Sequence, residues 1–263
     1  MKIACTYSNR YENDNKRWID EMLDAGFSYM EIAVSKLPED ETAQDEIISY
    51  ALSRGLTLNL HAPYGINNIS SSDEARRASS VANVKHSIDL AARHGLGTVT
   101  FHPGRLSDDT ETADKNWDRM MAIVADISQY AKAKKVFVGI ENMELRPYEL
   151  VYTVADLNRF ARFAENNPYF GVTVDFTHYS SHGIGMPDLG KLKLPIYDVH
   201  LSQNIAGKMH RALSSEGGLL DIAEVCRRLL DYGYDGLVVL EVLEDYMGES
   251  KDTLQKVLKT LNA

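Results

Sequence analysis

The sequence contains little cysteine, little proline and no long run of apolar residues. Its two cysteines, Cys5 and Cys226, do not form a pair at metal-ligand spacing, so a small disulfide-stapled fold is excluded and we expect both thiols to be buried in a reducing compartment. No stretch approaches the ~20 apolar residues of a membrane-spanning helix, and the polar N-terminal stretch does not resemble an export signal. These features predict a soluble cytoplasmic protein without a membrane partner.

The sequence is also short of positive charge. Lys and Arg total 28 against 38 Asp and Glu, which gives a formal net charge of −10 with neutral His and an isoelectric point of about 5.3. This balance provides no general attraction for nucleic acid or for an anionic membrane, although one local basic groove remains compatible with it. Nucleic acid is therefore the less favoured partner, and a small molecule is the more favoured one.

Short apolar runs rich in β-branched residues alternate with amphipathic stretches along the whole chain of 263 residues. The short runs predict eight strands, at residues 2–6, 29–34, 56–61, 98–102, 136–141, 171–175, 196–201 and 237–241. The longer stretches predict helices at 14–26, 43–55, 74–95, 113–134, 154–165, 219–233 and 251–263, with only a short helix after the sixth strand. No linker divides the chain, so we expect an α/β fold with a single (β/α)8 TIM-barrel domain over residues 1–263.

Histidines and carboxylates gather at the predicted carboxyl ends of these strands, which is where barrel enzymes have their active sites. They are His61, His102, Glu141, Asp175, His178, His200 and Glu241, with His210 in the loop after the seventh strand. Carboxylates that converge in a barrel mouth repel one another and lose hydration unless a cation neutralises them. Mixed nitrogen and oxygen ligands suit Zn²⁺, Mn²⁺, Co²⁺ or Fe²⁺ better than Ca²⁺ or Mg²⁺. The sequence therefore predicts a divalent metal site.

The series LHAPYG, FHPGR, IENM, VDFTH, VHLSQN and the final LE resembles the xylose-isomerase-like superfamily of TIM barrels. That superfamily contains sugar and sugar-phosphate isomerases and epimerases together with the endonuclease IV family. The resemblance to the epimerases implies that Glu141, Asp175, His200 and Glu241 bind one metal, that the two glutamates also transfer a substrate proton, and that His178 contacts a substrate oxygen. The chemistry is consistent, because a metal that chelates a carbonyl and the adjacent hydroxyl stabilises the enediolate formed when the proton leaves.

The resemblance to endonuclease IV enzymes extends to His61, His102 and His178, which in that family help to bind additional zinc ions. The third zinc of that family also requires an Asp-x-His motif after the seventh strand, whereas this sequence reads GKMHRALSSEGG and supplies His210 without the Asp. This departure weighs against three-metal phosphodiester chemistry. We therefore expect a divalent-metal-dependent isomerase or epimerase of a small sugar or sugar phosphate, with a zinc-dependent apurinic/apyrimidinic DNA endonuclease as the alternative.

Three further residues are candidates for substrate contacts. Glu31 alternates with apolar residues in its strand, so a role beside the metal or substrate competes with a structural ion pair. Lys208 and Arg211 are candidates for binding a substrate phosphate, and a solvated basic loop is the competing interpretation.

A third alternative for the whole protein is a sugar-binding barrel without catalysis, but such a barrel does not need two proton-transfer glutamates. The sugar, the metal and the oligomeric state stay open at this stage.

Overall fold

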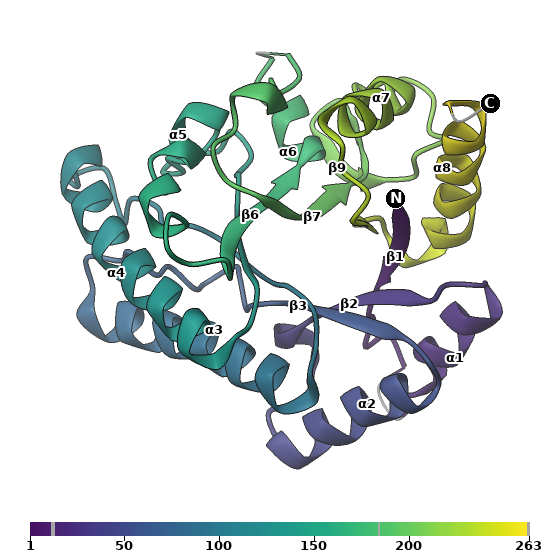
Figure 1. Ribbon diagram of the computed structural model, residues 1–263, viewed down its shortest axis with the longest axis horizontal. Coiled ribbons are helices and arrows are strands. Elements are labelled where there is room, and N and C mark those ends of the chain that lie inside the picture. The colour runs from purple at the N-terminus through teal and green to yellow at the C-terminus, as the bar shows by residue number, and fades with distance from the viewer. Residues whose placement is uncertain (12–13, 184, 262–263) are drawn as a thin grey trace.

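The computed structural model of the protein describes residues 1–11, 14–183 and 185–261. Eight parallel strands form a closed barrel in the order β1-β10-β7-β6-β5-β4-β3-β2, with helices around it (Figure 1). The barrel strands are β1 (Lys2–Thr6), β2 (Tyr29–Ala33), β3 (Thr57–His61), β4 (Val99–Phe101), β5 (Val138–Glu141), β6 (Phe170–Asp175), β7 (Ile196–Leu201) and β10 (Leu237–Leu240). The predicted fold class is confirmed, and every predicted strand boundary lies within two residues of the observed one.

The helices are α1 (Arg17–Asp24), α2 (Glu41–Ser53), α3 (Glu74–His94), α4 (Ala113–Lys134), α5 (Val154–Asn158), α6 (Phe176–Ser180), α7 (Ile222–Tyr232) and α8 (Met247–Leu261). The side chains of Asp40, Asp73 and Asp221 accept hydrogen bonds from backbone N–H groups in the first turns of α2, α3 and α7, which explains where these helices begin. None of the helices in the described part of the chain has the length and hydropathy needed to cross a membrane.

Two helices differ most from the sequence-based expectation. Helix α8 begins at Met247 rather than at residue 251, and the last two positions of the predicted helix, 262–263, lie outside the described residues. The helix expected at 154–165 is broken, because α5 ends at Asn158 and a short 3-10 helix, η2 (Ala161–Phe163), follows. The prediction of one domain over residues 1–263 likewise includes positions 12–13, 184 and 262–263, which lie outside the described residues.

An antiparallel hairpin follows strand β7, and the sequence did not predict it. Its strands are β8 (Gln203–Ile205) and β9 (Lys208–Arg211), joined by a turn in which Ala206 and Gly207 have positive φ angles of 49° and 83°. The hairpin lies beside β7 and α7 (Figure 1). The hairpin matters for the arrangement of the strand ends because it brings His210 next to the end of β10.

The barrel interior contains a polar layer just below the strand ends. Thr100 and Thr173 share a hydrogen bond of 2.8 Å between their hydroxyl oxygens, and the Asn59 amide donates to Oδ2 of Asp198 at 2.5 Å. Gly139 lies in the same layer, and a Cβ atom at this position would be 2.3 Å from Oγ1 and 3.0 Å from the backbone nitrogen of Thr173. Strand β5, which ends at Glu141, therefore approaches β6 as closely as it does because residue 139 has no side chain.

We expect Gly139→Ala to lower the free energy of unfolding by about 1–3 kcal/mol, because the added methyl group must displace both the side chain and the backbone of Thr173. Urea unfolding followed by circular dichroism measures this loss. Gly248→Ala is the matched control, since nothing lies within 4 Å of a Cβ there and the residue is in α8, where Ala is a better helix former. Equal stability of the two variants would contradict the close approach.

Candidate active site

Four residues at the ends of neighbouring strands form the centre of the site. Glu141 ends β5, Asp175 ends β6, His200 lies in β7 and Glu241 directly follows β10. Each offers one ligand atom, and these atoms all lie within 4.8 Å of one another. Because β5, β6, β7 and β10 are consecutive in the barrel, their ends converge although the residues are separated by 100 positions of sequence. We call these residues the quartet.

His200 links the quartet to a fourth carboxylate, that of Glu31. Its Nδ1 atom lies 3.2 Å from Oε1 of Glu141 and 3.3 Å from Oε1 of Glu241, whereas its Nε2 atom lies 3.3 Å from Oε2 of Glu31. Burial alone would lower the pKa of this imidazole, but the Glu241, Glu31 and Glu141 carboxylates together raise it well above its usual value. With Nε2–H donating to Glu31, Nδ1 is the atom that faces the quartet.

Asp175 has one carboxylate oxygen in use and one without a partner. Oδ1 accepts the backbone N–H of His178 at 2.8 Å, which caps α6. Oδ2 is buried and has no hydrogen-bond partner among the described residues. Burial raises the pKa of Asp175 to about 6, and the Glu241 and Glu141 carboxylates act in the same direction. The nearest imidazole nitrogen, Nδ1 of His178, lies 3.5 Å from Oδ2 and already donates to Asn142. A buried carboxylate oxygen that accepts no hydrogen bond and lies among three other ligand atoms fits a divalent cation.

Glu141 also belongs to a second cluster, with His61 and His102. Its Oε2 atom lies 3.3 Å from Nε2 of His61 and 3.1 Å from Nε2 of His102, and one ligand atom from each residue fits within the same 4.8 Å limit. Burial lowers the pKa of His61, but the bond to Glu141 and the charge of Glu31 raise it overall to about 9. At His102 the effect of burial dominates, and its pKa is lowered. The imidazoles of His200 and His102 in turn hold the pKa of the Glu141 carboxylate well below its usual value, against the effect of burial.

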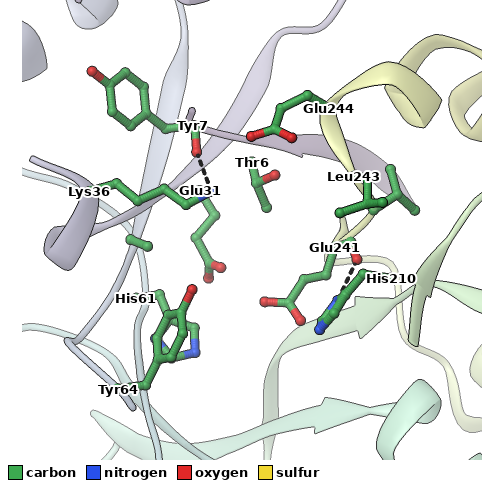
Figure 2. Close-up of a pocket in the computed structure, with 12 residues that line it drawn as sticks. Thr6, Tyr7, Glu31, Lys36, His61, Tyr64, His210, Glu241, Leu243 and Glu244 are labelled. Atoms are coloured by element: carbon green, nitrogen blue, oxygen red, sulfur yellow. Dashed lines mark hydrogen bonds between the residues drawn. The ribbon is translucent and has the colours of Figure 1, made fainter. Parts of the chain in front are cut away.

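A cavity of about 240 Å³ opens beside the quartet. Glu31, His61, Tyr64, His210 and Glu241 line it, and Figure 2 shows the His61 and Tyr64 rings on one side and Glu241 with His210 on the other. Glu141 and Asp175 do not line this cavity. Of the two glutamates expected to transfer a proton, Glu241 is thus the one in the cavity wall, and its side chain is 19% exposed against 1% for Glu141.

Two more of the expected histidines lie beside the quartet. His210, with a φ of 60°, donates from Nδ1 to the carbonyl oxygen of Glu241 at 2.7 Å, so its Nε2 is left for the cavity that it lines. His178 donates from Nδ1 to the carbonyl oxygen of Asn142 at 2.8 Å, and the same atom lies 3.5 Å from Asp175 Oδ2. Burial lowers the pKa of His178, but the Asp175 and Glu141 charges raise it to about 9.

The basic residues of the site are not the ones expected from the sequence. Lys208 and Arg211 lie on β9, and neither lines the cavity. Lys36, at the end of the 3-10 helix η1 (Val34–Lys36), does line it and donates to the carbonyl oxygen of Tyr7. The sequence signal for Lys36 was only its position just after a predicted strand, which it shares with many rim residues.

Comparisons with known proteins agree with this fold. A family model described as a xylose isomerase-like TIM barrel matches residues 19–263. The D-psicose 3-epimerase of Ruminiclostridium cellulolyticum is 26% identical over 260 residues, covering 89% of this chain and 80% of that protein. The D-psicose 3-epimerase of Enterocloster bolteae is 25% identical over 240 residues, covering 87% of this chain and 76% of that protein.

Solved structures show the same barrel. A D-tagatose 3-epimerase-like protein superimposes with a TM-score of 0.85 at 20% identity, over 100% of this chain and 98% of that one. D-psicose 3-epimerase with D-tagatose, from Clostridium cellulolyticum H10, superimposes with a TM-score of 0.75 at 21% identity, over 98% and 99%. These likenesses concern the fold, whereas the family model matches the sequence itself along most of the chain. This protein therefore belongs to the family of xylose isomerase-like TIM barrels.

Proposed function

We propose that this protein is a divalent-metal-dependent epimerase or isomerase of a small sugar, which acts by proton transfer at a carbon next to a carbonyl group. The observation that carries the proposal is the convergence of Glu141, Asp175, His200 and Glu241 beside a cavity, with Oδ2 of Asp175 unpartnered. The relatives that are D-psicose 3-epimerases support the reaction class. A barrel that only bound a sugar would not need to bury this many carboxylates at its mouth.

In this proposal the quartet would hold one Zn²⁺, Mn²⁺, Co²⁺ or Fe²⁺ ion. Such an ion would supply a Lewis acid that stabilises the negative charge of an enediolate. Glu31 accepts the Nε2–H of His200 and leaves Nδ1 as the ligand atom. Such a carboxylate behind a ligating histidine fixes the ring orientation and its tautomer.

Proton transfer is assigned to the two glutamates. Burial raises the pKa of Glu241, but the neighbouring His200 lowers it overall, so this carboxylate in the cavity wall is ionised at neutral pH and acts as the base. Glu141 is the second proton-transfer group. His61 lines the cavity and lies 3.3 Å from Glu141, so in this proposal it passes the proton between Glu141 and the substrate. His210 donates or accepts at a substrate oxygen through Nε2.

We expect Asp175→Ala and His200→Ala to remove stoichiometric metal, because each deletes one of four ligands, while the barrel stays folded. Elemental analysis per chain and far-ultraviolet circular dichroism measure the two effects. Glu31→Gln keeps all four ligands, and we expect it to weaken metal affinity by about 10–100-fold, as competition with a chelator will show. Full metal occupancy in both alanine variants would contradict the quartet as the metal site.

Isotope exchange tests the reaction itself. With D-psicose, D-tagatose or D-fructose in D₂O and Mn²⁺ or Co²⁺ present, we expect deuterium to enter the carbon next to the carbonyl, because the abstracted proton exchanges during the enediolate lifetime. Glu141→Gln and Glu241→Gln should each suppress this exchange, and Glu46→Gln, an exposed glutamate on α2, is the matched control. The same variants are assayed for metal content, so that loss of a ligand is separated from loss of the base.

A second candidate function, DNA incision of the endonuclease IV kind, is favoured by one observation. His61, His102 and Glu141 form a cluster that fits an additional metal. Against it stands the loop after β7. If His210 is the His of the Asp-x-His motif, Lys208 stands at the Asp position, and if His210 takes the Asp position, Ala212 stands at the His position. Among the described residues that line the cavity, Lys36 is the one Lys or Arg, so these walls do not form the basic groove that DNA would require.

The double variant His61→Ala, His102→Ala separates the two functions. We expect it to lose sugar exchange while retaining one metal per chain, because the two histidines then serve the substrate and Glu141 rather than a second ion. Elemental analysis and isotope exchange measure both. A fall from two or three metals per chain to one, with incision of an abasic-site duplex by the parent protein, would favour DNA repair.

A further inference from the structure

One side of the cavity is made by a lysine and a glutamate that the proposed proton transfer does not use. Lys36 is the last residue of η1, after β2, and Glu244 is the first residue of η4 (Glu244–Tyr246), after β10. Both side chains are half-buried, and both line the cavity that contains Glu241. In the view of Figure 2 they lie across this cavity from His61 and His210.

The ammonium group of Lys36 is held in place by a backbone carbonyl group. It donates to the carbonyl oxygen of Tyr7 at 3.4 Å, and its charge lies near enough to Glu244 to lower the pKa of that carboxylate. An ammonium group has three N–H donors, so two of them remain for a ligand in the cavity. Lys36 therefore presents hydrogen-bond donors to whatever the cavity binds.

The carboxylate of Glu244 is likewise held by its neighbours. The hydroxyl of Ser8 donates to its Oε1 atom at 2.8 Å, and Arg10 bonds the adjacent Asp245 at 3.0 Å, so the loops after β1 and β10 are joined. Burial raises the pKa of Glu244, but its own backbone N–H and the Ser8 hydroxyl lower it overall. Glu244 is thus ionised and presents acceptors only.

The charges of the cavity wall disfavour an anionic substrate. Among the described lining residues Lys36 is the one Lys or Arg, against the carboxylates of Glu31, Glu241 and Glu244. A phosphate dianion beside Lys36 would also stand beside Glu244, and like charges at close range are a strong means of discrimination. A sugar hydroxyl both donates and accepts, so neighbouring hydroxyls satisfy an ammonium group and a carboxylate together.

We propose that Lys36 and Glu244 bind neighbouring hydroxyl groups at the end of the sugar remote from the reacting carbon, and that Glu244 makes the site selective for uncharged sugars over sugar phosphates. This inference rests on the proposed function and narrows its substrate class. Selectivity arises because a phosphate dianion offers no hydrogen-bond donor to the Glu244 carboxylate and is repelled by its charge. A sugar hydroxyl instead donates a hydrogen bond to this carboxylate.

The test compares D-fructose with D-fructose 6-phosphate, using the Mn²⁺-loaded protein. Isotope exchange gives kcat and KM, and calorimetric titration gives Kd for both compounds whether or not either is turned over. We expect the parent protein to prefer D-fructose by about tenfold or more. Lys36→Met should raise KM for D-fructose by about tenfold with little change in kcat, because a hydrogen bond to a charged group is lost away from the reacting atoms.

Glu244→Gln should reduce the preference for D-fructose over D-fructose 6-phosphate by lowering the Kd for the 6-phosphate. The substitution removes the repulsion between the carboxylate and the phosphate and keeps the shape of the side chain. Lys256→Met and Glu46→Gln, at exposed positions on α8 and α2, are the matched controls and should leave both compounds unaffected. Preference of the parent protein for the 6-phosphate, abolished by Lys36→Met, would overturn the proposal and make Lys36 a phosphate ligand. Unchanged constants in both cavity variants would also overturn it.

These outcomes are distinct from failure of the proposed function. If no ketose exchanges its proton, the epimerase proposal fails, while the calorimetric comparison still decides whether the cavity discriminates by charge. If exchange occurs but the cavity variants behave like their controls, the reaction class stands and the selectivity proposal alone is wrong.

Discussion

The carboxylates buried together at the barrel mouth are the constraint on which the site depends. Glu31, Glu141 and Asp175 are at most 2% exposed, and Glu241 is only partly exposed. Negative groups this close are tolerated only when cations face them, and in the protein alone the cations are imidazolium rings. The raised pKa values of His61, His178 and His200 express that neutralisation. If the proposed metal ion binds the quartet, it would displace the proton on the ligating nitrogen of His200, so metal binding and proton release would be coupled.

The polar layer beneath the mouth extends the same constraint into the barrel. Asp198 precedes His200 by two residues on β7, and one of its oxygens lies within 4.8 Å of ligand atoms from Glu31 and His200. Burial raises the pKa of Asp198 to about 8, the charge of Glu31 acts in the same direction, and the Asn59 amide opposes them. A protonated Asp198 adds no negative charge beside the Glu31 and His200 side chains. The orientation of His200 thus depends on residues that never reach the cavity.

Much of the fold follows from patterns that burial imposes on the sequence. Barrel strands are buried on both faces, so their continuous apolar runs were visible, and the site residues at their ends followed from the rule that such ends line the mouth. The hairpin β8–β9 was not visible, because strands of three or four residues, most of them polar, are too short to show a periodicity. Lys36 was missed and Lys208 favoured for a related reason. Which rim side chain turns inward depends on how each loop packs, and no local signal in a sequence encodes that packing.

The position of β10 between β1 and β7 has a consequence for how the protein is made. This strand starts at Leu237, pairs with β1 at the opposite end of the chain, and is followed at once by Glu241. During synthesis the ribosome therefore releases Glu241 and the closing strand almost together, after every other ligand has emerged. A nascent chain has three members of the quartet but no closed wall to hold them. If the proposed metal ion binds the quartet, tight metal binding and barrel closure would be a single late event. The ion would then stabilise only chains in which β10 has paired with β1 and β7.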